Sequence, residues 1–202
     1  MNIALVTKKV QNFKKSEKYS EVKKRLKEFD FSMKEHREWF SELCFCLLTA
    51  NATAEGGIKV QNALGKRFHL LSEKELSREL KNLRYRFPNK RAHYICVAQK
   101  CFKIKDMIKN MPSKEAREFL VENVKGMGMK EASHFLRNTG RTDVAIIDRH
   151  ILRSMGKEVK SISRKEYENA EKILENVARK TKTTLAELDL ILWAMQTGKV
   201  LK

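Results

Sequence analysis

A lysine and an aspartate, eighteen positions apart, have types and positions that suit chemistry as well as packing. Lys130 follows two glycines in the stretch VKGMGMKEASHF and opens a predicted helix. Asp148 follows the apolar run VAII and opens the next predicted helix. A lysine amine can attack an electrophilic carbon, and a carboxylate can stabilise the positive charge that develops in such a reaction. The pair therefore suggests nucleophilic catalysis by an amine.

Both residues also have an ordinary structural interpretation. A free lysine has a pKa of ~10.4, whereas a nucleophilic amine needs a pKa of about 7–8. On the residues alone, Lys130 is better explained as a solvated surface charge. Asp148 is of a type preferred at a helix N-cap, and capping is compatible with a catalytic role. Arg149, which follows it, either contacts a phosphate or faces solvent.

The sequence around Lys130 predicts a helix, a tight turn and a second helix over residues 113–138. The turn contains Lys125, Gly126 and Gly128, and glycine permits positive φ angles and a close approach of another backbone. N–H groups at the start of the second helix form an anion site that suits a DNA phosphate. We therefore predict DNA contacts by the three turn residues, as in a helix-hairpin-helix. A plain αα-hairpin is the alternative.

The composition favours a polyanionic ligand. The 202 residues include 43 Lys and Arg and 25 Asp and Glu, which gives a formal net charge of +18. A highly charged surface explains many lysines but not so large an imbalance, so we predict nucleic-acid binding. No apolar run reaches the ~18 residues of a membrane span, and no signal peptide is recognisable, so we expect a cytoplasmic protein. The four cysteines are expected to be free thiols, and their spacing matches no zinc signature.

Helical periodicity runs through almost the whole chain, which contains only two prolines. The pattern predicts an all-α fold of about ten helices, including a buried helix at 34–49 and a long helix at about 90–110. Ser72 and Glu75 form a capping-box pattern at another helix start. The length suits one domain, or two small lobes that share a core.

The hairpin VKGMGMKEA, followed by VAIIDRHI, is similar to the helix-hairpin-helix DNA glycosylases that carry a Gly/Pro-rich loop and an aspartate. The resemblance spans nearly the whole chain. It implies that Lys130 is the nucleophile and that Asp148 is the supporting carboxylate. It also implies that Asn51, in LLTANATAEGGIKVQNAL, fills the space left by an extruded nucleotide. A cap that ends the preceding helix is an equal alternative for Asn51.

Two further segments, RFPNKRAHYI and the end ILWAMQTGKVLK, resemble the archaeal-type 8-oxoguanine DNA glycosylase/AP lyases of that superfamily. The resemblance implies that Trp193 and an aromatic residue near Phe87 stack on the two faces of the extruded base. It also implies that Lys202, with a terminal carboxylate, contacts the Watson–Crick edge of the purine. Core packing is the alternative for Trp193 and Phe87, and a frayed tail is the alternative for Lys202.

The chain departs from the superfamily pattern in two places. The hairpin has Lys125 where a proline is common, and the cysteine cluster that holds an iron–sulfur centre in the endonuclease III branch is missing. The resemblance implies an enzyme without cofactor or metal that flips and removes 8-oxoguanine and cleaves the strand by β-elimination. The alternatives are an oxidised-pyrimidine glycosylase/lyase and a non-catalytic helix-hairpin-helix DNA-binding protein.

We expect residues 1–202 to form one helix-hairpin-helix glycosylase unit of two lobes with a cleft between them. The central lobe is predicted at about 31–154 and includes the hairpin 113–138, and the second lobe is predicted from 1–30 and 155–202. The expected partner is double-stranded DNA containing 8-oxoguanine. The expected state is a monomer, associated with the nucleoid in the cytoplasm.

Overall fold

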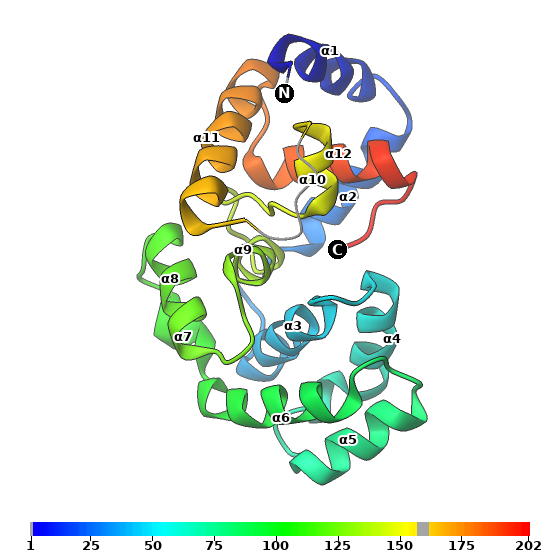
Figure 1. Cartoon of the computed structure of the whole chain (residues 1–202), viewed down its shortest axis with the longest axis vertical. Coiled ribbons are helices and arrows are strands. Elements are labelled where there is room, and N and C mark those ends of the chain that lie inside the picture. The colour runs from blue at the N-terminus through cyan, green and yellow to red at the C-terminus, as the bar shows by residue number, and fades with distance from the viewer. Residues whose placement is uncertain (1, 157–161) are drawn as a thin grey trace. The chain divides into compact units, whose positions relative to one another are not determined.

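The computed structural model describes residues 2–156 and 162–202, and the regular structure in these residues is helical throughout (Figure 1). No strand occurs in either range, so the predicted all-α fold is confirmed. The elements are α1 (Ile3–Phe13), α2 (Lys18–Glu28), α3 (His36–Thr49), α4 (Ala54–Leu64), η1 (Gly65–Arg67), α5 (Glu73–Asn82), α6 (Pro88–Ala98), η2 (Gln99–Cys101), α7 (Ile104–Ile108), α8 (Ser113–Asn123), α9 (Met129–Asn138), α10 (Arg149–Ser154), α11 (Arg164–Thr181) and α12 (Leu185–Thr197).

The single long helix predicted at about 90–110 is wrong. Helix α6 gives way to the 3-10 turn η2 before α7 begins. The side-chain amide of Gln99 donates to the carbonyl groups of Phe68 and Leu71, at 3.0 and 2.8 Å. These bonds hold the break against a turn that lies about thirty positions earlier in the chain. The local pattern is helical on both sides, so the break depends on a distant contact.

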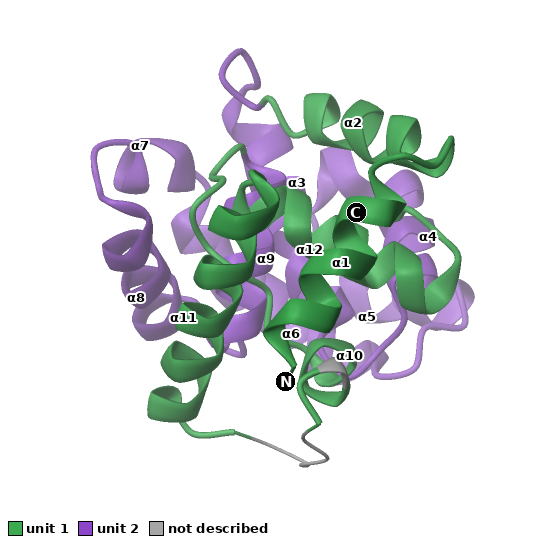
Figure 2. Ribbon diagram, turned by 90° about the horizontal axis from the view of Figure 1, so that it is seen from above, with its two compact units in different colours: residues 1–30, 140–202 green, residues 31–139 purple. Residues whose placement is uncertain are grey.

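Contacts between Cα atoms divide the chain into two compact units (Figure 2). Unit 1 contains residues 1–30 and 140–202, and unit 2 contains residues 31–139. Helices α3 to α9 therefore lie in unit 2, and α1, α2 and α10 to α12 lie in unit 1.

Segment 140–154 groups with unit 1, whereas the sequence placed it in the central lobe. The backbone of this segment is bonded to α11. The N–H of Ala145 donates to Oε1 of Glu171 at 3.0 Å, and the hydroxyl of Tyr167 donates to the carbonyl of Ala145 at 2.7 Å. Both α11 side chains are buried. The grouping follows from these bonds, which a pattern of local helices does not reveal.

Helix α3 forms the centre of unit 2. All its residues from Trp39 to Thr49 are buried, and it contacts α4, α6, α7 and α9. The helix predicted as buried is therefore confirmed, with its start at His36. Helix α5 lies against α6, and α8 lies against α9. Removal of apolar surface from water is the main stabilising contribution to such packing.

Helix α12 forms the centre of unit 1 and contacts α1, α2, α10 and α11. Leu188, Ile191 and Leu192 are among its buried residues. The hydroxyl of Tyr19 on α2 donates to Oε1 of Glu187 on α12 at 2.5 Å. Burial, the hydrogen bond and the charge of this carboxylate raise the pKa of Tyr19 to about 12. The phenol therefore stays protonated and joins the two helices over the ordinary pH range.

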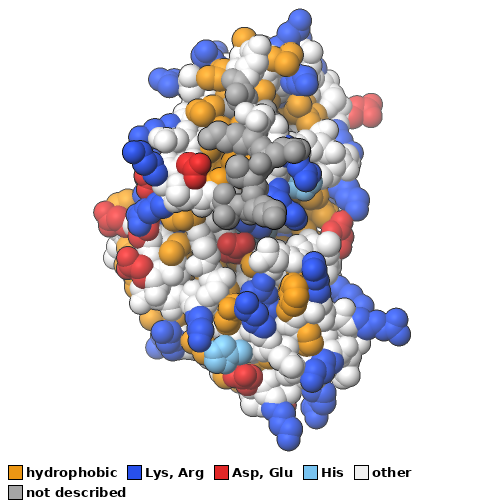
Figure 3. All heavy atoms as spheres, in the orientation of Figure 1, with side chains coloured by type: hydrophobic (Ala, Val, Ile, Leu, Met, Phe, Trp, Pro, Cys, Tyr) orange, Lys and Arg blue, Asp and Glu red, His pale blue; other side chains and the backbone are white. Residues whose placement is uncertain are grey.

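The surface shows the basic character of the composition. Most of the charged side chains visible in Figure 3 are Lys and Arg, as the formal net charge of +18 requires. Among the described residues, no helix is both long enough and apolar enough to cross a membrane.

Candidate active site

The predicted hairpin is formed by α8 and α9, which lie against each other in unit 2. In the turn between them, Gly126 has a φ of +87°, a left-handed conformation that glycine adopts at little cost. A Cβ at this position would overlap the ring of Tyr94, which lies on α6. The turn therefore requires glycine both for its backbone conformation and for the space that the aromatic ring occupies.

Helix α9 starts without a side-chain cap. Its N-cap residue is Gly128, with φ −103° and ψ −176°. Because glycine has no side chain, it offers no acceptor to the N–H groups of the first helical turn. These donors and the positive end of the helix dipole suit an anion such as phosphate. Lys125, in the same turn, is exposed to solvent.

Lys130 lies in the first turn of α9, where 31% of its side chain is exposed. Its Nζ lies 3.5 Å from Oε1 of Glu131, whose side chain is 14% exposed. The amine is thus partly covered and paired with a carboxylate. Glu131 was missed in the sequence, although the adjacent opposite charges in MKEAS were a signal for it. A lysine in such an ion pair is an ammonium, and it becomes a nucleophile only after it loses a proton.

Asp148 follows the buried run Val144–Ile147 and is the N-cap residue of α10 in unit 1. Its Oδ1 accepts the N–H of Ile151 at 2.8 Å, so the capping interpretation is confirmed. The preceding backbone is fixed as well, because the N–H of Ile147 donates to the hydroxyl of Tyr167 at 3.2 Å. The cap bond uses one carboxylate oxygen, and the second oxygen of the group can act on a developing positive charge.

The other predicted residues of unit 1 lie in α10, in α12 and in the segment after α12. Trp193 lies in the second half of α12 and is half-buried. Close to it in sequence, Nε2 of Gln196 donates to the carbonyl of His150 at 2.9 Å, which joins α12 to the helix that Asp148 caps. The remaining predicted residues of this unit are also accessible to solvent: Arg149 is exposed, and Lys202 is half-buried.

Phe87 is the residue before α6 and is half-buried, so it is not part of the core. The guanidinium of Arg86 lies 4.8 Å from the centroid of the Phe87 ring. This is a cation–π distance, and Arg86 therefore covers one face of the ring. Stacking of a base on Phe87 needs the other face.

Asn51 follows α3 with a φ of +57° and is exposed. Asparagine tolerates this left-handed geometry after a helix end, so its local role as a helix-ending residue agrees with the structure. The buried Arg91 of α6 donates to the carbonyl of Ala50, and the hydroxyl of Tyr85 donates to the carbonyl of Leu48. Burial raises the pKa of Tyr85, which keeps this hydroxyl a donor. The last carbonyl groups of α3 thus have partners.

Helix α6 contacts the backbone beside Asn51 and the glycine turn of the hairpin. Phe87 occupies the N-cap position without a side-chain cap bond, Arg91 holds the backbone next to Asn51, and Tyr94 lies under Gly126 of the hairpin. The sequence pattern does not reveal these supports, and the contacts themselves stay predictions. In the sequence, these supports lie within the segment RFPNKRAHYI, where only the aromatic residue Phe87 suggests a site.

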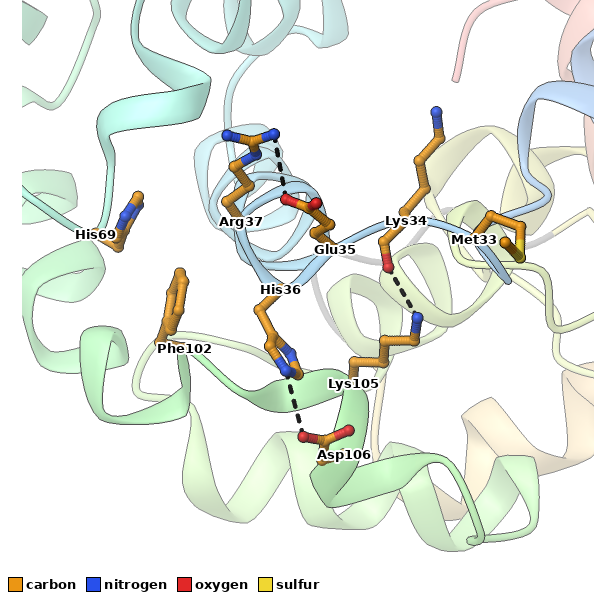
Figure 4. A pocket seen from close by; sticks show the side chains of 9 residues that line it. All are labelled: Met33, Lys34, Glu35, His36, Arg37, His69, Phe102, Lys105 and Asp106. Atoms are coloured by element: carbon orange, nitrogen blue, oxygen red, sulfur yellow. Dashed lines mark hydrogen bonds and ion pairs between the residues drawn. The ribbon is translucent and has the colours of Figure 1, made fainter.

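A pocket of about 520 Å³ lies elsewhere in unit 2, and none of the predicted site residues lines it (Figure 4). His69 stacks on Phe102 in its wall, with ring centroids 4.6 Å apart. Nε2 of His36 lies 3.3 Å from Oδ2 of Asp106, and the Lys105 amine donates to the carbonyl of Lys34 at 2.8 Å. Several polar groups of this pocket pair with one another, and neither Lys130 nor Asp148 lines it.

Within residues 2–156 and 162–202, no group of three or more His, Cys, Asp and Glu side chains is arranged to hold a metal ion. The four cysteines are free thiols. Burial raises the pKa of Cys44 and of Cys101, so these two stay protonated and behave as small apolar side chains.

The sequence matches a known family. A family described as 8-oxoguanine DNA glycosylase matches residues 22–183. The chain is 49% identical over 206 residues to the 8-oxoguanine DNA glycosylase/AP lyase of Methanocaldococcus jannaschii, with 98% of this chain and 100% of the relative covered. It is 44% identical over 188 residues to the protein of the same name from Thermotoga maritima, with 89% and 90% covered.

Solved structures agree with these matches. The chain is similar, with a TM-score of 0.95 and 48% identity, to the Methanocaldococcus jannaschii 8-oxoguanine glycosylase/lyase in complex with a 15mer DNA containing 8-oxoguanine. That match covers 98% of this chain and 100% of the other. The 8-oxoguanine DNA glycosylase of Thermotoga maritima is similar with a TM-score of 0.92 and 40% identity, and both chains are covered completely, at 100%.

Proposed function

The chain belongs to the 8-oxoguanine DNA glycosylase family, and on this premise we propose that it removes 8-oxoguanine from double-stranded DNA and cleaves the strand at the resulting site. It is a bifunctional DNA glycosylase and DNA-(apurinic or apyrimidinic site) lyase. Family membership favours this function over an oxidised-pyrimidine glycosylase and over a non-catalytic DNA-binding protein.

Lys130 is the nucleophile of the proposed reaction. Its amine, released from Glu131 and deprotonated, attacks C1′ of the damaged nucleoside. The bond between nitrogen and C1′ forms while the bond between C1′ and the base breaks, and the base leaves with the electron pair and takes up a proton. The sugar ring opens to a Schiff base with the lysine. Loss of a C2′ proton then expels the 3′ phosphate oxygen, which cleaves the strand by β-elimination.

Asp148 supports this chemistry through its charge. The deoxyribose ring gains positive charge as the base departs, and a fixed carboxylate stabilises that charge without reorganisation. The same group assists deprotonation of the attacking amine. The hydrogen bond to the N–H of Ile151 fixes the orientation of the carboxylate, so capping and catalysis use the same geometry.

The remaining site residues bind DNA or the extruded base. The backbone contacts are made by Lys125, Gly126, Gly128 and Arg149, Asn51 fills the space of the flipped nucleotide, and the base is held by Phe87, Trp193 and Lys202. Aromatic planes stack on a flipped base of any identity, so selectivity for the oxidised purine comes from contacts to its edge. The protein acts as a monomer on chromosomal DNA in the cytoplasm.

One observation carries the proposal: a partly covered lysine amine lies in the first turn of a hairpin helix that has no side-chain cap. Borohydride reduces a Schiff base to a stable covalent link, so it tests this assignment directly. We expect a trapped complex with duplexes that contain 8-oxoguanine or an abasic site, and none with a guanine duplex. Equal trapping of a thymine glycol duplex and an 8-oxoguanine duplex would contradict the proposed substrate.

A further inference from the structure

We propose that His93 is a positioning residue that orients the amine of Lys125 toward the DNA backbone, with Glu73 fixing the protonation pattern of the His93 ring. The inference rests on the proposed function, because it takes the hairpin turn as a DNA contact. It adds side chains from α5 and α6 to that contact.

Three side chains of unit 2 form a continuous chain of hydrogen bonds. Oε2 of Glu73, the first residue of α5, lies 3.1 Å from Nδ1 of His93 on α6. Nε2 of the same ring lies 3.2 Å from Nζ of Lys125 in the hairpin turn. The histidine and glutamate side chains are 41% and 51% exposed, and Lys125 is exposed as well. The lysine amine is therefore held and still accessible to an external phosphate.

The donors and acceptors of this chain can be assigned from chemistry. A lysine ammonium has three N–H donors and no acceptor, so Lys125 donates and Nε2 of His93 accepts. The ring is then neutral with its proton on Nδ1, and this proton is donated to the carboxylate of Glu73. Glu73 thus stabilises the one neutral tautomer that can receive the lysine. Two N–H donors of the amine remain for phosphate oxygens.

A second contact joins α6 to the hairpin turn beside Lys125. Tyr94, the neighbour of His93, lies under Gly126, the neighbour of Lys125. Two consecutive residues of α6 therefore hold two consecutive residues of the hairpin turn. A lysine side chain has four flexible bonds, and holding it before DNA arrives reduces the entropy that binding would otherwise cost. Pre-orientation of Lys125 is the function that this arrangement can supply.

A double-mutant cycle tests whether His93 acts through Lys125. Affinity for an undamaged duplex is measured for each variant under the same conditions. Lys125→Ala and His93→Ala should each weaken binding by about threefold to tenfold. The double variant should bind no more weakly than Lys125→Ala alone. His93→Gln should restore binding to within about twofold, because its amide oxygen can accept from the lysine.

Lys74→Ala is the matched control, because Lys74 is an exposed basic residue next to Glu73 on α5. Its effect should add to that of Lys125→Ala, as expected for independent charges. Full additivity of His93→Ala with Lys125→Ala would overturn the proposal, and so would unchanged binding by His93→Ala or Lys125→Ala. Excision of 8-oxoguanine by the wild-type protein is measured in parallel. Its absence would count against the proposed function, whereas the cycle is read on undamaged DNA and judges His93 separately.

Discussion

Helices α9 and α10 begin with almost the same backbone geometry and with different chemistry. The N-cap residue Gly128 has φ −103° and ψ −176°, and the N-cap residue Asp148 has φ −100° and ψ −177°. At α10 the Asp148 carboxylate accepts the N–H of Ile151, whereas Gly128 provides no such acceptor at α9. Both conformations are extended and open to any residue. The presence or absence of one side chain therefore makes the difference.

Because of this difference, the starts of α9 and α10 suit different functions. At the closed start of α10, the Asp148 side chain satisfies one of the helix's own donors, and this bond fixes the carboxylate. The open start of α9 leaves its donors for an external anion, which the proposed function identifies as a DNA phosphate. Lys130 lies at this open start, where the helix dipole disfavours positive charge, and Glu131 offsets that effect with its carboxylate. Substitutions at each start can test this division.

Removal of the amine at the open start should have the largest effect. Lys130→Gln keeps a polar side chain of similar length but has no nucleophilic nitrogen, so strand cleavage should fall by at least about a thousandfold. Affinity for the lesion duplex should be largely retained, because the proposed phosphate contacts belong to other residues. Single-turnover cleavage and borohydride trapping measure the two properties. Trapping of the variant at the wild-type level would exclude Lys130 as the nucleophile.

At the start of α10, we expect excision to depend more on the charge of Asp148 than on its role as a helix cap. Asp148→Asn keeps a good N-cap residue and removes the charge, so excision should slow by about a hundredfold with an unchanged melting temperature. Asp148→Ala removes both properties and should also destabilise the protein by about 1 kcal/mol. Comparison of excision rates with thermal unfolding separates the two roles. Near-normal excision by the asparagine variant would reduce Asp148 to a helix cap.

Closing the open start should weaken DNA binding without harm to the fold. A Cβ at Gly128 has the flexible carboxylate of Glu131 as its nearest neighbour, at 3.3 Å, so a side chain can be accommodated. Gly128→Asn adds an acceptor, and Gly128→Asp adds an acceptor with a negative charge. We expect affinity for an undamaged duplex to fall in that order, by about tenfold for the aspartate. If both variants bind like the wild type, phosphate does not use this helix start.

The sequence predicted the features that depend on nearby residues. The capping box of Ser72 and Glu75 is present, because the serine N–H donates to Oε2 of the glutamate at 2.9 Å. The N-cap role of Asp148 and the burial of α3 also follow from local patterns, since residue type and apolar spacing determine them. The glycine turn was predicted because only its sequence is needed to recognise it.

The features that the sequence did not predict depend on residues far apart in the chain. The side chain of Gln99 holds the break after α6 by bonds to a distant turn, and Tyr94 lies under a glycine more than thirty positions away. Arg91 holds the end of α3 in the same way. Each is an ordinary residue of a helical pattern, and its role comes only from the tertiary fold. The sequence could therefore propose the reacting groups, which stay predictions, but it could not reveal the residues that support them.

The start of α5 is a third helix start, and here a substitution is expected to have the smallest effect. Its cap is reciprocal, because Glu75 accepts bonds from the hydroxyl of Ser72, at 2.6 Å, and from its backbone N–H. These bonds, the hydroxyl first, lower the pKa of Glu75. The Glu75 carboxylate therefore binds a proton more tightly in the unfolded chain than in the folded protein. The stabilisation is present above the ordinary pKa and is lost as the pH falls through the lowered one.

Ser72→Ala removes the hydroxyl bond and leaves the backbone bond, so the pKa of Glu75 should rise toward its ordinary value. The acid loss of stability at this helix start should then be smaller and be complete at a higher pH. An NMR titration of the Glu75 carboxyl measures the shift, and Ser77→Ala is the control, because the Ser77 hydroxyl donates to Asn89 in the same region. An unchanged Glu75 titration in Ser72→Ala would mean that the backbone bond alone closes this start. A full shift would mean that side chains determine whether a helix start is closed, as the contrast between Gly128 and Asp148 requires.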